Sequence, residues 1–140
     1  MLRSLLAALV LPSLALAPLA AHADIDPGSW EMSVTSTFEG MPGAVGPVVQ
    51  TRCFTQADAR DPSRVLGSAA SPGCEFTNRR DTGAEFSFDL KCGGQVPMQG
   101  SGKVRYGREA MEADISLEGS ANGQKFSARS RVSGRRLGPC

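Results

Sequence analysis

Histidine is almost missing from this 140-residue sequence: His22 is the only one, and it lies near the start of the chain. Familiar catalytic motifs are missing as well, since there is no Cys-x-x-Cys, no Gly-x-Ser-x-Gly and no glycine-rich phosphate loop. Enzymes usually need a nucleophile with a base, a metal, or a carboxyl group sheltered from water. We therefore expect that the protein is not an enzyme and has no catalytic residues, no metal ligands and no cofactor.

A surplus of charge of one sign is also missing. The chain has 15 Lys and Arg residues against 14 Asp and Glu residues, a formal net charge of +1. This balance gives no reason to expect nucleic acid or an anionic surface as a partner. Because aromatic residues make up only 6% of the chain, base stacking is not expected either. The basic residues near the end of the chain therefore predict a solvated outer face rather than a phosphate-binding stripe: Lys125, Arg129, Arg131, Arg135 and Arg136.

Apolar runs long enough to span a bilayer are absent too, because a span needs about 20 such residues. The stretch from Leu5 to Leu19 is shorter than that, follows Arg3, and precedes a small-x-small cleavage site at Ala21-His22-Ala23. These features predict a secretory signal peptide over residues 1–23 and a single β domain over residues 24–140. We expect no membrane span after cleavage.

Four cysteines, an even number, fall in the expected mature part. Small secreted domains in oxidising compartments use such cysteines as structural disulfides. Without histidine, a zinc site would need four widely spaced thiolates, and a thiol catalyst would lack its base. We therefore expect two disulfides among Cys53, Cys74, Cys92 and Cys140.

Alternation of apolar and polar residues with period two runs through most of the mature chain and predicts half-buried β-strands. In the first strand, Trp30 and Met32 fall on one face and Glu31 on the other. A stretch rich in Gly and Pro over residues 40–47 is expected to turn the chain, and a second strand is expected over residues 48–54. One short helix is expected after it, with Thr55 as its N-cap and Asp58 three residues further on.

Turn signals predict how the strands pair. Asn122-Gly123 is a strong two-residue hairpin signal, and a turn centred there places Ala113 opposite Val132 and Asp114 opposite Arg131. Apolar residues then meet each other and opposite charges meet, whereas a slip by one residue would destroy both matches.

A second hairpin is expected to turn at Gly107-Arg108, which pairs Val104 with Met111 and Lys103 with Glu112. Its second strand is also the first strand of the Asn122-Gly123 hairpin. Both turns place the same side chains of this shared strand on the inner face, and the agreement supports the pairing.

A third turn, at Asp81-Thr82-Gly83, sets Cys74 directly opposite Cys92 and within disulfide reach. Cys53 and Cys140 are then left to pair. The predicted fold is all-β: a single-domain antiparallel meander of about seven strands, curled into an open barrel or sandwich, with one short helix and two disulfides.

A curled sheet of this size has a large concave face, yet large apolar side chains are few in the mature chain. Either the sheet collapses on itself, or a gap remains that a small apolar ligand can fill. Gly100 and Gly102 let the sheet bend, or they leave room for the Trp30 ring or for a ligand. The candidate ligand-facing residues are those expected on the inner face: Trp30, Met32, Phe86, Phe88, Met98, Gly100, Gly102 and Val104.

Two functions are consistent with this pattern. One is a binding module that holds a small apolar ligand on the inner face of the curled sheet. The other is a cell-envelope interaction or structural protein whose sheet edge or exposed face docks another envelope protein. Fully packed inner positions would favour the second function, and a cavity next to Trp30, Gly100 and Gly102 would favour the first.

Three stretches carry a resemblance to a known family: Pro27-Gly28-Ser29-Trp30-Glu31, Gly94-Gln95-Val96-Pro97-Met98 and Gly134-Arg135-Arg136-Leu137-Gly138-Pro139-Cys140. Together with the four cysteines, they make the mature chain similar to the small secreted bacterial proteins of domain-of-unknown-function family 3617. Members of that family often have Leu where Ser29 stands here. The resemblance implies a periplasmic protein of a Gram-negative bacterium without an established activity, and it supplies no catalytic residues.

Overall fold

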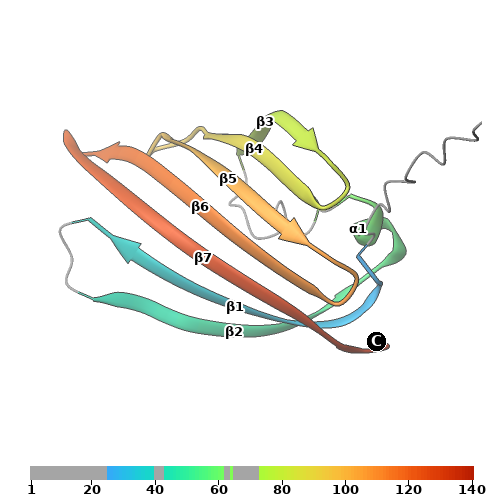
Figure 1. The fold of residues 1–140 in the computed structure, drawn as a ribbon. Coiled ribbons are helices and arrows are strands. Elements are labelled where there is room, and N and C mark those ends of the chain that lie inside the picture. Colours follow the sequence, from blue (N-terminus) through green and yellow to red (C-terminus); the bar gives the residue numbers. More distant parts are fainter. Residues whose placement is uncertain (1–24, 40–42, 62–63, 65–72) are drawn as a thin grey trace, which may run out of the picture.

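The strands of this chain are joined edge to edge in one sheet (Figure 1). The computed structural model describes residues 25–39, 43–61, 64 and 73–140. The expected signal peptide, residues 1–23, lies outside the described residues. In chain order, the elements are β1 (Gly28–Phe38), β2 (Ala44–Phe54), α1 (Gln56–Arg60), β3 (Cys74–Asp81), β4 (Glu85–Cys92), β5 (Met98–Tyr106), β6 (Ala110–Ala121) and β7 (Gln124–Gly138).

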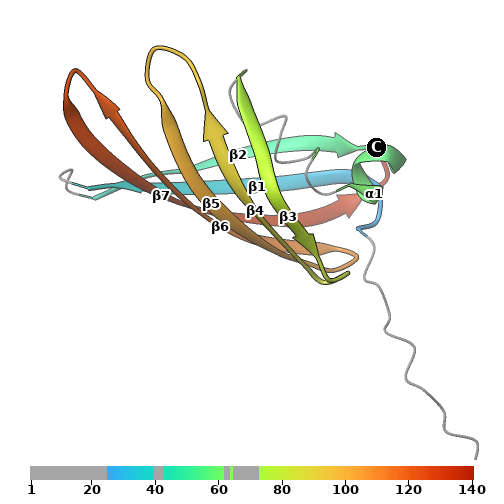
Figure 2. The same cartoon turned by 90° about the horizontal axis from the view of Figure 1, so that it is seen from above.

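All neighbouring strands are antiparallel, in the order β2-β1-β7-β6-β5-β4-β3. From β3 to β7 the chain forms a meander, and β1 pairs with β7, so the first hairpin extends the sheet beyond the last strand. The sheet is strongly curled: β1 and β2 lie below the meander in Figure 1, and β3 crosses their direction steeply in Figure 2.

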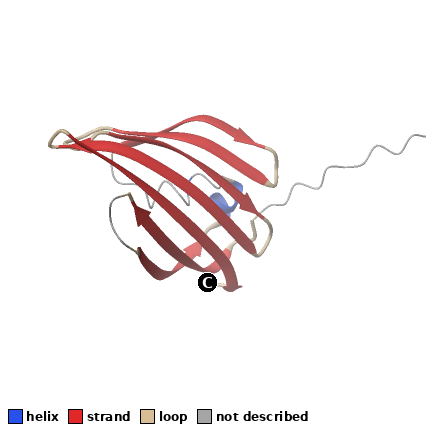
Figure 3. Cartoon of the chain, turned by 60° about the vertical axis from the view of Figure 1, so that its left-hand side comes forward, coloured by secondary structure: helices blue, strands red, loops and turns tan. Residues whose placement is uncertain are grey.

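The sheet does not close, because β2 and β3 remain as its two edges. The predicted seven-stranded antiparallel fold with one short helix and two disulfides is therefore confirmed, in an open form. Strands make up most of the described chain, as Figure 3 shows, and α1 lies on the same side of the molecule as the C-terminus in Figures 1 and 2.

The hairpin between β6 and β7 has the predicted register. Ala113 lies opposite Val132, and Asp114 lies opposite Arg131. The two turn residues, Asn122-Gly123, adopt φ angles of 51° and 76°, the positive values that a type I′ turn requires at both central positions. This turn chemistry is specific enough to determine the register from the sequence.

The hairpin between β5 and β6 differs from the prediction by two residues. Lys103 pairs with Asp114, whereas Glu112 was expected opposite it. The reason lies in the turn, where the Gly107 backbone N–H donates a hydrogen bond to the Ala110 carbonyl at 2.9 Å. Gly107 closes this turn instead of forming its tip, so the turn is centred one residue beyond the predicted position.

A shift of two residues leaves every side chain on its predicted face. Val104 pairs with Ala113 instead of Met111, and all three side chains are buried on the inner face. On the outer face, Lys103 forms an ion pair with Glu85 at 3.0 Å. The error in register therefore changes the charge partners but not the composition of the core.

Both predicted disulfides, Cys74–Cys92 and Cys53–Cys140, are present. Cys74 lies opposite Cys92 in the ladder between β3 and β4, as the turn at residues 81–83 predicted. The two bonds close very different lengths of chain, with sequence separations of 18 and 87 residues.

The hydrophobic core covers one face of the sheet. Three phenyl rings pack together there: the Phe88 ring lies 5.4 Å from the Phe86 ring and 4.9 Å from the Phe76 ring, between centroids. Such aromatic pairs add about 0.5–1.5 kcal/mol beyond the burial of their area. The buried apolar residues of the core cluster are Ile25, Trp30, Met32, Phe54, Ala59, Phe86, Phe88, Leu90, Cys92, Val104, Met111, Ala113 and Val132.

We expect Ala113→Asp to destabilise the protein far more than Asp114→Ala. Ala113 is only 2% exposed, so an aspartate there would be a buried, unpaired charge costing on the order of 3–5 kcal/mol. The Asp114 side chain is 52% exposed, and its ion pairs with Arg105 and Arg131 contribute about 0.2–1 kcal/mol each. Urea unfolding followed by Trp30 fluorescence measures both losses. The reverse order would mean that the two faces of β6 are assigned wrongly.

Candidate functional site

The eight residues expected to face a ligand lie together on the inner face of the sheet, which also carries the core. Met98 and Gly100 are half-buried, and the others are buried. None of the eight residues is exposed. Their role in facing a ligand stays a prediction. The buried residues of this set are Trp30, Met32, Phe86, Phe88, Gly102 and Val104.

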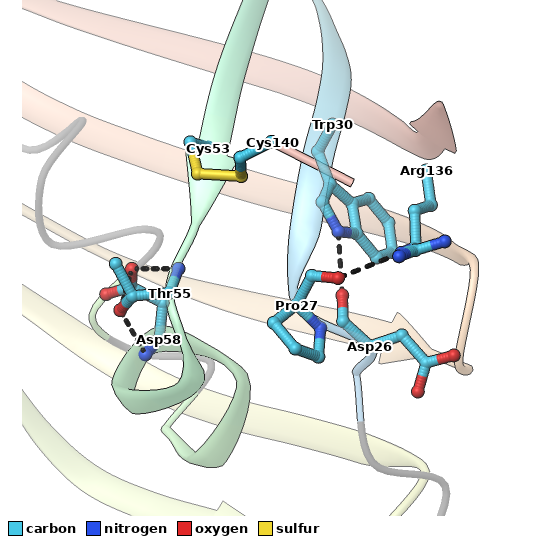
Figure 4. The surroundings of a disulfide bond; sticks show 8 residues. All are labelled: Asp26, Pro27, Trp30, Cys53, Thr55, Asp58, Arg136 and Cys140. Carbon is cyan, nitrogen blue, oxygen red and sulfur yellow. Dashed lines mark hydrogen bonds between the residues drawn. A yellow bond between two sulfur atoms is a disulfide. The ribbon is translucent and has the colours of Figure 1, made fainter. Parts of the chain in front are cut away.

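Trp30 is fully buried, and Figure 4 shows its indole N–H directed at the backbone of Asp26. Its ring stacks on Phe54, with centroids 5.2 Å apart and planes 16° from parallel. Its indole N–H donates a hydrogen bond to the backbone carbonyl of Asp26 at 2.9 Å. Because the residue is 0% exposed and its polar atom is satisfied, Trp30 has the features of a core anchor.

The space at the two inner glycines is also filled by the protein. A Cβ on Gly102 would overlap the Phe88 ring, and a Cβ on Gly100 would overlap the backbone of Ser116 and touch the Leu117 side chain. The ring that uses the room at Gly102 is therefore that of Phe88, not that of Trp30. Both inner glycines are thus packed against the protein's own atoms.

Burial on the inner face decreases along the strands away from Trp30. On β1, Val34 is half-buried and Phe38 is 36% exposed. On β6, Ile115 and Leu117 are half-buried, whereas the preceding inner residues are buried. The inner face is thus packed at the Trp30 end and more open at the other end.

The edge strand β2 is the most exposed apolar feature of the described chain. Residues 44–53, which we call the β2 edge, are all exposed and are followed by the buried Phe54. Three valines of this segment are 50–55% exposed: Val45, Val48 and Val49. An exposed apolar edge strand presents unpaired backbone N–H and C=O groups and is a template for pairing with another chain.

Most of the β2 edge is regular. From Val48 to Phe54, each residue of β2 pairs with one residue of β1, and the register shifts only beyond Val48, where the chain passes through Gly46 and Pro47. The sequence predicted a strand over residues 48–54 but not its position at the edge. That position follows from the pairing of β1 with β7, which no turn signal indicates.

The opposite edge, β3, is protected. A bulge lies between Thr77 and Arg80, and Asn78 within it takes a positive φ of 48°. Three consecutive charged residues, Arg79, Arg80 and Asp81, lie at the end of this edge strand. Bulges and charges on an edge strand discourage pairing with another chain, so the two edges of the sheet differ in character.

A concavity of about 770 Å³ lies at the end of the sheet away from Trp30. Its lining is mixed: Met98, Pro97 and Phe126 contribute apolar surface beside the charged and polar residues. Strand pairing places Lys91, Gln99, Glu118 and Ser127 in one row beside it. The charges around it are mixed and give no preference for a ligand of one charge. Among the described residues, no group of three or more His, Cys, Asp or Glu side chains could hold a metal ion.

The short helix α1 follows the β2 edge directly and begins with the predicted N-cap. The Thr55 hydroxyl accepts a hydrogen bond from the Asp58 backbone N–H at 3.2 Å, and the Thr55 backbone N–H donates to the Asp58 carboxylate at 2.9 Å. The Thr55 hydroxyl also donates to this carboxylate at 2.7 Å. The carboxylate of Asp58 thus accepts two hydrogen bonds from Thr55, and both lower its pKa: the bond from the hydroxyl has the larger effect, and the bond from the backbone N–H the smaller one. Their contribution to stability is present above the ordinary pKa of aspartate and is lost as the pH falls through the lowered value.

The comparison with known families agrees with the resemblance carried by the motifs at residues 27–31 and 134–140. A family described as "protein of unknown function (DUF3617)" matches residues 25–140. The chain belongs to the DUF3617 family. No curated protein and no solved structure matches it.

The location of this DUF3617 protein can be narrowed from two findings. The family match starts at residue 25, two positions after the expected end of the signal peptide at residue 23, and the fold carries two disulfides. Both are consistent with an extracytoplasmic location, because disulfides persist in oxidising compartments. In the described part of the chain, no helix is long and apolar enough to cross a membrane.

We expect Gly102→Ala to destabilise this DUF3617 protein by about 1–3 kcal/mol, because the added methyl group would push into the Phe88 ring in a packed core. Gly107→Ala is the matched control. Its Cβ would meet only the Ala110 carbonyl, at 4.0 Å, and should cost much less. Thermal and urea unfolding compare the two variants. Equal stability of Gly102→Ala and the wild type would mean that the inner face has free space beside Gly102.

Proposed function

We propose that this DUF3617 protein is an interaction protein of the Gram-negative periplasm, without enzymatic activity, that binds an extended segment of another envelope protein along the β2 edge. The observation that carries the proposal is the run of exposed residues 44–53 on an edge strand. In strand addition, the main chain of the partner supplies the affinity, and alternate side chains supply the specificity.

The chemistry of the β2 edge indicates the chemistry of the partner segment. Val48 lies opposite Val34 and belongs to the inner side, whereas Val49 lies opposite Ser33 and belongs to the outer side. A segment added to β2 would therefore meet one valine on each of its faces. No charged residue occurs before Arg52 in this strand, so an uncharged, β-branched segment complements it best.

The contrast between the two edges supports the same function. Natural sheets commonly protect their edges with bulges and charges, and β3 carries both devices. The regular part of β2, from Val48 to Cys53, carries only Arg52. The irregularity at Gly46 and Pro47 confines the unprotected part of β2 to residues 48–53. A regular stretch of this kind beside a protected opposite edge is the pattern expected of a docking strand.

Export to the periplasm is part of the proposal. The Ala21-His22-Ala23 site predicts cleavage after residue 23. The mature mass in a periplasmic extract should then correspond to a chain that begins at Asp24. A periplasmic protein that retains residues 1–23 would contradict this part of the proposal.

A small apolar ligand remains the second candidate. The observation that favours it is the decrease in burial on the inner face, where Val34, Ile115, Leu117 and Met98 are only half-buried. An acyl chain or another apolar guest would bury these side chains further. Native mass spectrometry of the protein purified from the periplasm tests this candidate. A bound apolar ligand would add the mass of a lipid-sized molecule to that of the protein, and the absence of such an added mass would contradict it.

Strand addition can be tested with a defined probe. The probe is a capped, uncharged peptide of alternating valine and threonine, about six residues long, the length of a typical strand. We expect its titration into the isotope-labelled protein to shift the amide signals of residues 48–53 most strongly. Val49→Lys should weaken the binding at least about tenfold, since a lysine on an edge strand opposes pairing.

Val96→Lys is the matched control, because Val96 is also an exposed valine, at 38%, but lies between β4 and β5. This variant should bind the peptide like the wild type. Larger shifts in β3 than in β2, or equal weakening by both lysine variants, would contradict strand addition at the β2 edge.

A further inference from the structure

The two disulfides lie in different surroundings. Cys92 is 5% exposed and belongs to the core cluster, and the half-buried Cys74 packs against that cluster. Cys53 and Cys140 are both exposed. One bond is therefore shielded by the packed side chains of the inner face, and the other is accessible from solvent.

The exposed bond ties two separate parts of the sheet together. Cys53 lies on β2 opposite Ser29 of β1, and Ser29 also lies opposite Gly138 at the end of β7. Cys140 follows two residues later and reaches Cys53, so the bond connects β7 to β2 across the start of β1 (Figure 4). It links β2 to a strand with which β2 shares no hydrogen-bonded ladder.

The sheet does not depend on this bond alone at that end. Seven consecutive residues of β1, from Gly28 to Val34, pair with β2 from Phe54 back to Val48. The Phe54 ring, next to Cys53 in the chain, stacks on Trp30 and is 4% exposed. These interactions hold β2 against β1 whether or not the two sulfur atoms are joined.

We propose that Cys53–Cys140 is a site of thiol–disulfide exchange in the folded protein, whereas Cys74–Cys92 is closed to exchange. The co-reactant is a dithiol. Access of the attacking thiolate to a sulfur atom is a main determinant of the rate, and only Cys53–Cys140 lies between two exposed residues.

The reaction proceeds in two displacements. A thiolate of the dithiol attacks one of the two sulfur atoms, a mixed disulfide forms, and the other sulfur leaves with the electron pair and takes up a proton. The second thiol of the reagent, as its thiolate, then displaces the protein sulfur, which is also protonated. The protein disulfide is reduced by two electrons to two thiols, and the dithiol is oxidised to its own disulfide. The reverse reaction restores the bond and the tie between β2 and β7.

The experiment uses the oxidised full-length mature protein under native conditions, with dithiothreitol as the dithiol. Samples are quenched with an alkylating reagent at successive times and mapped by mass spectrometry. We expect alkylation of Cys53 and Cys140 at least about tenfold earlier than that of Cys74 and Cys92. The fluorescence of Trp30 and the circular dichroism of the sheet should stay unchanged during the early phase.

Simultaneous opening of both bonds, or earlier opening of Cys74–Cys92, would overturn the proposal, and so would loss of the Trp30 signal along with Cys53–Cys140. The control variant Cys53→Ser/Cys140→Ser should stay folded and show no early alkylation. If this variant does not fold, the bond is needed for folding and the proposal is wrong. In the variant Cys74→Ala/Cys92→Ala, provided that it folds, Cys53 and Cys140 should open at the wild-type rate.

Discussion

The antiparallel pairing of β1 with β7 is the interaction on which the rest of the structure depends. It joins the first hairpin to the meander of β3 to β7 and places β2 at the edge of the sheet. Gly134 makes part of this pairing possible, because a Cβ there would overlap both Met32 of β1 and Met111 of β6. The two methionine side chains close over the glycine and connect the core of the hairpin with the core of the meander. The same pairing brings the end of β7 close enough to β2 for the Cys53–Cys140 bond.

Local turn chemistry explains which parts of the fold could be predicted from the sequence. Asn122-Gly123 requires a type I′ turn, and the register between β6 and β7 follows from it. Gly107 carries a weaker signal, since a glycine can close a turn as well as form its tip, and the β5–β6 register was wrong by two residues. The pairing of β1 with β7 joins strands that are far apart in the sequence, and no turn residues indicate it. For this reason, the sequence could not identify β2 as an edge strand.

In the candidate site, too, local sequence patterns determine some features, and the packing of distant segments determines the others. Period-two alternation placed Trp30, Met32, Phe88 and Val104 correctly on the inner face, but alternation determines a face and not an exposed fraction. The exposed fraction depends on which neighbours fill the space, such as Phe54 over Trp30 and the Phe88 ring over Gly102. The sequence predicted that Val48 and Val49 belong to a strand, but it placed Val45 in the preceding turn, whereas β2 begins at Ala44. Only the strand order shows that these exposed valines lie at an edge of the sheet. Packing at one end and exposure at the edge are therefore the observations that support the proposed docking at β2.

The central claim is that β2 can pair with another strand on the side away from β1, where the described part of the chain places no neighbouring strand. Residue-resolved hydrogen exchange of the oxidised mature protein, measured at several dilutions, tests this claim most directly. In the monomer, every second amide from residue 48 to residue 53 should exchange fast because it points away from β1, and those between them should be protected, as should the amides of β7. Uniform protection of this segment in the dilute monomer would mean that another part of the chain already covers the β2 edge, and the proposed docking strand would not exist.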